Sequence, residues 1–172
     1  MANTYTLIAS NTVGSGGAAS IDFTSIPATY TDLLIKTSMR GSAVDTWIQV
    51  KVTFNGSTTG YTNKNLLGSG SAASSSTNNF TNSIGRGMLS EGTNYTANTF
   101  ASSDFYIPNY TSSNYKSTSS EATTENNAIA NTTVLDAGLW SNTAAINQIT
   151  LTSDSGNFAQ YSTAYLYGIK NS

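Results

Sequence analysis

The 172-residue chain contains no cysteine and no histidine. Without cysteine there is no disulfide, no thiolate nucleophile and no thiolate metal ligand. Without histidine the most common general base is missing, so Ser-His-Asp and Cys-His catalytic arrangements are excluded. A pair of carboxylates across a cleft, as in glycosidases, is still available, but none of the nine acidic residues lies in a motif. We therefore expect no enzyme activity and no cofactor, and a small polysaccharide-cleaving domain is the least favoured alternative.

Charged residues are also scarce, at 9% of the chain against about 25% in an average domain. The formal net charge of -2 provides no basic surface of the kind that nucleic acid requires. No apolar run approaches the roughly 20 residues of a membrane-spanning helix, and the N-terminus lacks the apolar stretch of a signal peptide. We expect neither nucleic acid nor a membrane as a partner. We also expect the protein to be synthesised in a cytoplasm.

Small polar residues replace the missing charge, with 26 Ser, 27 Thr and 19 Asn. Disordered chains are poor in aromatic residues, whereas this chain has 10 Tyr, 6 Phe and 2 Trp. Thr, Tyr, Val, Ile and Phe suit strands, and Ser, Asn and Gly suit turns. The composition therefore predicts an all-β domain with long polar loops.

Alternating patterns locate the strands. The clearest is residues 47–54, where Ile48, Val50, Val52 and Phe54 share one face. A hairpin-turn signal, Asn-Gly, follows it. Further candidate strands are residues 4–10, 20–24, 32–40, 84–89, 100–107, 113–122, 133–141, 146–152 and 161–169. Between residues 56 and 99 the pattern is weak, and we interpret the low-complexity run 68–79 as a long loop or a solvated hairpin tip.

Eight to ten short strands at this spacing are typical of a sandwich or a barrel. We predict one domain over residues 1–172, an antiparallel two-sheet sandwich. The jelly roll is the favoured topology, and an immunoglobulin-like sandwich is the alternative. No window has a helical period, and no repeat of fixed length indicates a propeller or a β-helix.

Two acidic residues inside candidate strands have a structural interpretation that we prefer to a catalytic one. We expect Asp32 or Asp136 to pair with Arg40 or Arg86, the only two arginines.

Two segments contain oxygen donors suited to calcium, at residues 154–157 and 125–127. Neither has the spacing of an EF-hand loop, and Asp, Asn and Gly are ordinary turn residues. We therefore expect no metal site.

Tyrosine provides the one candidate recognition surface. Tyr61, Tyr95, Tyr110 and Tyr115 fall in segments rich in Asn and Ser. Tyrosine combined with Ser, Asn and Gly is typical of adaptable recognition loops, and its ring can stack on sugars. We expect these four side chains to form a surface for recognition, with a glycan as one candidate ligand. The alternative is that they cover sheet edges and pack loops.

Several stretches share the pattern of a known group of proteins. They are FTSIPATYTDLLI at residues 23–35 with SMR at 38–40, VKVTFNG at 50–56 followed by Tyr61, and IPNY at 107–110. Further parts are KS at 116–117, ENN at 125–127, GLWS at 138–141, residues 146–151 and YLYGI at 165–169. The sequence thereby resembles virion proteins of tailed bacteriophages, notably marine ones. The resemblance covers most of the chain and is least at residues 62–99.

The resemblance implies a β domain of the kind found in capsid decoration proteins, head fibres, and tail fibres or spikes, with no catalytic residue. The predicted domain leaves no room for a fibre shaft, so a capsid decoration or cement protein is favoured. A receptor-binding protein of a tail or head fibre is the runner-up. The implied partners are further copies of the chain in a homotrimer, the major capsid or other virion proteins, and a host surface glycan. The implied location is the virion, after synthesis in the bacterial cytoplasm.

Overall fold

The computed structural model describes residues 4–78, 80–125 and 131–170, and these contain strands but no helix. The strands are β1 (Tyr5–Thr12), β2 (Ser20–Phe23), β3 (Asp32–Met39), β4 (Trp47–Phe54), β5 (Tyr61–Gly68), β6 (Ala73–Asn78), β7 (Ile84–Glu91), β8 (Ala101–Ile107), β9 (Lys116–Thr124), β10 (Thr132–Trp140), β11 (Ile149–Ser153) and β12 (Thr163–Ile169). The prediction of an all-β domain is confirmed. Over the described ranges, no helix is of a length and hydropathy that would cross a membrane.

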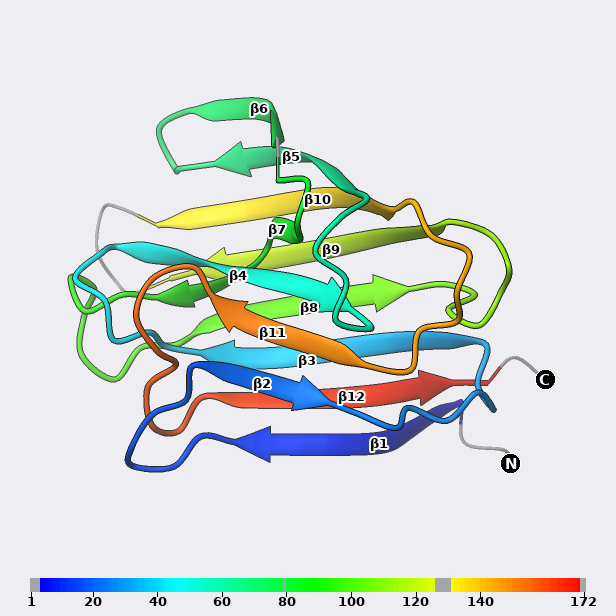
Figure 1. Ribbon diagram of the computed structural model, residues 1–172. Coiled ribbons are helices and arrows are strands. Elements are labelled where there is room, and N and C mark those ends of the chain that lie inside the picture. Colours follow the sequence, from blue (N-terminus) through cyan, green and yellow to red (C-terminus); the bar gives the residue numbers. More distant parts are fainter. Residues whose placement is uncertain (1–3, 79, 126–130, 171–172) are drawn as a thin grey trace.

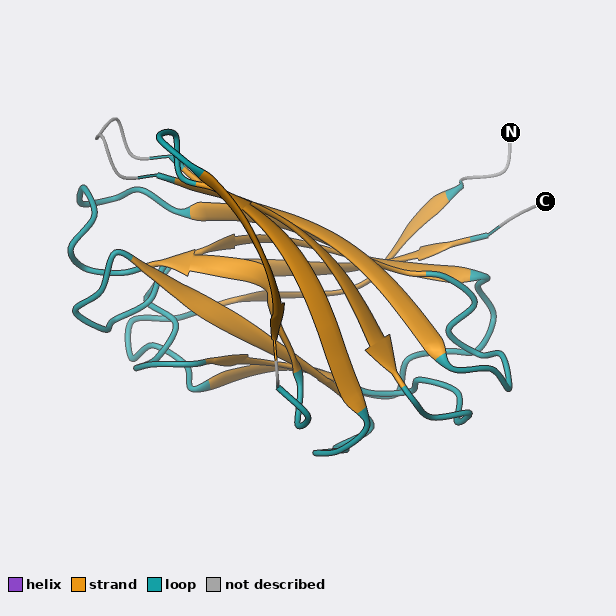
Figure 2. Ribbon diagram, turned by 90° about the horizontal axis from the view of Figure 1, so that it is seen from above, coloured by secondary structure: helices purple, strands orange, loops and turns teal. Residues whose placement is uncertain are grey.

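The strands form two antiparallel sheets that pack face to face (Figures 1 and 2). The large sheet has the order β1-β12-β3-β8-β9-β10-β5-β6, and the small sheet has the order β2-β11-β4-β7. Side chains from both sheets fill the space between them. The predicted two-sheet sandwich is therefore the observed architecture.

Eight of the strands have the order of a jelly roll. With the other four strands set aside, the chain changes sheet at every step from β1 through β2 and β3 to β4, and again from β7 through β8 and β11 to β12. Only β4 and β7 follow each other within one sheet. When these eight strands alone are renumbered from 1 to 8 in chain order, the large sheet has the order 1-8-3-6 and the small sheet has the order 2-7-4-5. This is the order of a jelly roll. Two inserted hairpins, β5–β6 and β9–β10, extend the large sheet beyond β8. The jelly-roll prediction is confirmed, with four added strands.

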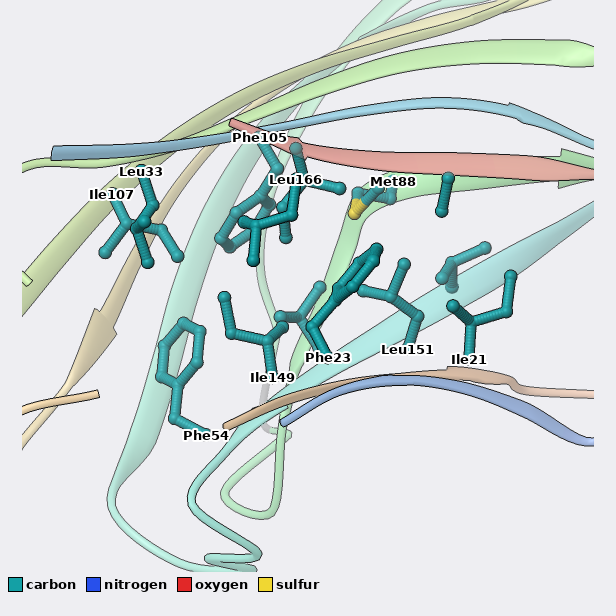
Figure 3. Close-up of a cluster of buried hydrophobic side chains, with 14 of the residues drawn as sticks. Ile21, Phe23, Leu33, Phe54, Met88, Phe105, Ile107, Ile149, Leu151 and Leu166 are labelled. Carbon is teal, nitrogen blue, oxygen red and sulfur yellow. The ribbon is translucent and has the colours of Figure 1, made fainter. Parts of the chain in front are cut away.

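The core lies between the eight jelly-roll strands and also includes Tyr61 of β5 and Trp140 of β10. On β4 the predicted face is buried, from Ile48 through Val50 and Val52 to Phe54. Figure 3 shows Phe54, Leu151 and Leu166 pointing into the same space from opposite sheets. Complete burial of a side chain of this size stabilises the fold by about 1.5–3 kcal/mol.

The inserted strands pack on β7 through a more polar layer. Their inward side chains include Asn63 on β5, Ser120 on β9 and Asp136 on β10. On β7, Gly87 lies so close to this layer that an added Cβ would come within 2.4 Å of the Ser120 Oγ. Small side chains are therefore required on both sides of the contact.

The weakly patterned region 61–78 forms β5 and β6, which the sequence pattern did not predict as two strands. Asn63 and Asn65 of β5 are buried while Leu66 is 51% exposed, which reverses the usual distribution of polarity. Pairing with β10 along its whole length holds β5 in place despite that reversal. The run 68–79 thus contains the second strand of a hairpin.

Candidate functional site

Three of the four tyrosines expected at a recognition surface are buried. Tyr61 is 1% exposed, Tyr95 7% and Tyr110 0%. The Tyr61 ring stacks on Trp140, with ring centroids 6.1 Å apart, and the Tyr110 hydroxyl donates a hydrogen bond to the Pro27 carbonyl.

The surface prediction is therefore wrong for these three side chains. A tyrosine can bury its ring in the core while its hydroxyl reaches a backbone group, so polar neighbours in the sequence do not indicate exposure. Tyr115 is 59% exposed, and its part in recognition stays a prediction.

The expected pairing of acidic residues with arginine is also corrected. Asp32 accepts hydrogen bonds from the Tyr106 hydroxyl and the Asn109 N–H, both at 2.8 Å, instead of pairing with an arginine. The Nη1 atom of Arg40 lies 3.7 Å from Oε2 of Glu91, a pair that we did not predict from the sequence.

Asp136 accepts a hydrogen bond of 2.7 Å from Asn63. Burial raises the pKa of Asp136 to about 6, although Asn63 and the charge of Arg86 act to lower it. Arg86 therefore affects Asp136 through space, without an ion pair between them within 4 Å in the described part of the chain.

The structure describes the calcium candidate at residues 154–157 completely and the candidate at residues 125–127 only in part. Asp154, in the loop that follows β11, forms an ion pair with Lys51 of β4. Residues 126 and 127 of the other segment lie outside the described residues. The described ranges contain no group of three His, Cys, Asp or Glu residues that could hold a metal ion.

A groove crosses the outer face of the large sheet, which is turned away from the small sheet. It consists of two adjoining depressions of about 340 Å³ each, which share Asp104, Glu121 and Leu135. Both volumes lie within the range of small-ligand sites, roughly 300–1,000 Å³. Lys36 lines one depression, and Tyr5 and Tyr106 line the other.

Strand register explains how these side chains meet. One row runs directly across six strands, from β12 to β5, through Tyr165, Lys36, Asp104, Glu121, Leu135 and Leu66. A neighbouring row runs from β1 to β10 through Leu7, Tyr167, Leu34, Tyr106, Ser119 and Ala137. Side chains two residues apart on a strand share a face, so both rows lie on the outer face.

The groove contains charged groups and, in its second depression, aromatic rings. Lys36 forms an ion pair with Asp104, and both side chains are partly exposed. Glu121 lies opposite Asp104 on β9 and has no ion-pair or hydrogen-bond partner among the described residues. Burial, reinforced by the Asp32 carboxylate, raises the pKa of Tyr106 to about 12, so this hydroxyl stays protonated. The groove therefore offers an unpaired carboxylate beside an ion pair and aromatic rings.

Sequence reasoning did not identify these groove residues. The alternation over 100–107 separates Asp104 and Tyr106 from the buried positions, which is the available signal. Residues 113–122 are polar on both faces and contain no such signal for Glu121. That signal does not say which strands are neighbours, so the groove could not be assembled from it.

A second surface lies at the end of the sandwich away from the start of β1 and the end of β12 (Figure 1). Four loops meet there, at residues 13–19, 40–46, 92–100 and 154–162. Backbone hydrogen bonds join them, from Ala18 N to Phe158 O (3.0 Å), from Ser42 N to Asn157 O (2.8 Å) and from Thr93 N to Ala43 O (2.9 Å). We refer to these four loops as the four-loop end.

The four-loop end exposes two large apolar side chains. Val44 is 82% exposed and Tyr161 is 67% exposed, the highest values among the large hydrophobic residues of the described ranges.

Comparisons of the chain with protein-family models, with curated proteins and with solved structures found no match.

Proposed function

We propose that the protein is a structural component of a tailed-bacteriophage virion, a decoration or cement protein that binds the outer surface of the capsid as a homotrimer. The resemblance to tailed-phage virion proteins supports the context. The jelly roll supports it at the level of fold, because viral capsid domains and lectins share this topology. The observation that carries the proposal is the four-loop end.

The four-loop end has the properties of a protein-binding surface. Val44 and Tyr161 project from loops that backbone hydrogen bonds already hold in place, so docking would order little additional chain. The charge of Arg40 is held by Glu91 and by the carbonyls of Tyr95, Thr96 and Thr99. A surface with few free charges can be desolvated at low cost against a capsid.

The trimer follows from the exposed sheet edges together with capsid symmetry. Strands β1 and β6 end the large sheet, and β2 and β7 end the small sheet. Such edges expose unpaired backbone groups that a neighbouring copy can cover. Identical subunits usually close symmetrically, and a trimer matches the local three-fold positions of an icosahedral lattice.

Binding to purified capsids that lack the protein tests the role. We expect Val44→Asp and Tyr161→Asp to weaken capsid binding at least tenfold while melting as the wild type does. Tyr115→Asp, a change to an exposed residue at the opposite end, is the matched control and should bind normally. Light scattering should give three times the 18.0 kDa chain mass. A monomer at high concentration, or equal capsid binding by all three variants, would contradict the proposal.

An experiment on phage particles that lack the protein distinguishes the decoration role from the receptor-binding role. Loss of capsid stability is expected for a decoration protein. Intact capsids that fail to adsorb to the host would instead identify the receptor-binding protein of a tail or head fibre. Glycan cleavage by the purified protein, abolished by replacing one carboxylate, would identify the polysaccharide-cleaving alternative.

A further inference from the structure

We propose that the groove on the outer face of the large sheet is a binding site for a chain of neutral sugars. This site is separate from the four-loop end and does not depend on the capsid role. Its central residues are Tyr5, Lys36, Asp104, Tyr106 and Glu121, which line the two adjoining depressions.

The groove combines the two kinds of contact that a sugar chain needs. Tyr5 is 56% exposed, and its ring gives a flat apolar surface on which the C–H face of a sugar ring can pack. Glu121 has no partner among the described residues and can accept hydrogen bonds from sugar hydroxyls. The hydroxyl groups of Ser102, Ser119 and Thr123 line the same depressions and can both donate and accept.

The shape suits an extended chain more than a single small molecule. The two depressions lie on either side of a shared row of side chains, Asp104, Glu121 and Leu135. The second depression extends from Tyr5 on β1 to Leu135 on β10, across six neighbouring strands, a length of about 24 Å at the usual strand spacing. Tyr5 and Leu135 stand at its two ends, and Asp104 and Glu121 lie between them.

The charges of the groove disfavour the other occupants. Its charged residues are Lys36, Asp104 and Glu121, so after the Lys36–Asp104 ion pair one negative charge remains. An acidic polysaccharide would be repelled by that charge. A second copy docked face to face would bring two such carboxylates together and bury them, which is costly. Neutral sugars satisfy the carboxylate by hydrogen bonds without adding charge.

Affinity electrophoresis of the full chain tests the site, in native gels that contain dextran, laminarin or mannan. We expect at least one of these neutral polysaccharides to retard the wild type, and Glu121→Ala and Tyr5→Ala to lower its affinity at least tenfold. The matched control is Asp22→Ala, which removes an exposed carboxylate from the other sheet. This control should change the affinity less than twofold. Leu135→Ala, at an exposed residue that lines both depressions, provides an independent groove variant if either of the first two has a lowered melting temperature.

Several outcomes would overturn the site. They are no retardation by any of the three polysaccharides, equal retardation of the groove variants and the control, and binding only to acidic alginate or to cationic chitosan oligomers. A change of oligomeric state in the groove variants without sugar binding would assign the face to a second copy of the chain. Because the four-loop end is not altered, the groove variants should still bind capsids, so failure of one proposal is distinguishable from failure of the other.

Discussion

The Tyr61 hydroxyl accepts a hydrogen bond of 2.8 Å from the backbone N–H of Phe54, inside the hydrophobic core. Phe54 is the last residue of β4 and Tyr61 is the first residue of β5, so this contact joins the jelly roll to the start of an inserted hairpin. Both side chains are almost completely buried. Tyr61 therefore has a structural role in place of the recognition role that the sequence suggested.

Replacing Tyr61 by Phe should lower the free energy of unfolding by about 1–3 kcal/mol, because the Phe54 N–H loses its partner in a dry environment. Urea unfolding measures this change. Tyr115→Phe removes an exposed hydroxyl and should have no effect. Equal stability of Tyr61→Phe and the wild type would show that the hydrogen bond contributes nothing.

Replacing Arg40 by Ala should destabilise the protein by about 3–5 kcal/mol, because Glu91 would keep a buried carboxylate without its counter-charge. Burial already raises the pKa of Glu91, while the Thr99 hydroxyl and Arg40 act to lower it. Chemical denaturation at neutral pH provides the measurement, with Lys64→Ala on the exposed face of β5 as control. A loss no larger than that of the control would rule out a structural role for the pair.

Stability should fall as the pH rises from about 4 to about 6, because of Asp136. Burial raises its pKa from 3.8 to about 6 in the folded state, so over this interval the folded protein binds the proton and the unfolded chain releases it. The shift corresponds to about 3 kcal/mol. Asp136→Asn should remove this part of the pH dependence, as measured by unfolding curves at several pH values. An unchanged slope in Asp136→Asn, or the same flattening in Asp22→Asn, would contradict the assignment.

Replacing Gly168 by Ala should destabilise the protein by about 1–3 kcal/mol through overpacking. A Cβ on Gly168 would lie 2.3 Å from the ring of Tyr30, whereas a Cβ on Gly14 would meet nothing within 4 Å. Thermal unfolding of Gly168→Ala and Gly14→Ala compares the two. If the close approach is the cause, Gly168→Ala and Tyr30→Ala should not be additive, and additive losses would indicate another cause.

The success of the strand predictions depended on whether polarity alternated along each strand. For β4, a regular alternation marks the buried face, and the structure buries those residues. For β5, the inward side chains are Asn63 and Asn65 and an outward one is Leu66, so no pattern of polarity marks the strand. Its position depends on pairing with β10, which is more than 60 residues away along the chain.

Local pattern alone establishes that this chain is an all-β sandwich with strands β3, β4 and β10 near their observed places, because a period of two is a property of adjacent residues. Composition alone likewise excludes chemistry that requires histidine or cysteine side chains. The neighbours of each strand are decided by packing between distant segments. That packing places β3, β8 and β9 side by side, brings Lys36, Asp104 and Glu121 into one row on the outer face, and folds Tyr61 and Tyr110 into the core. Burial and register depend on contacts across the whole fold, so the groove exists only at the level of the tertiary structure.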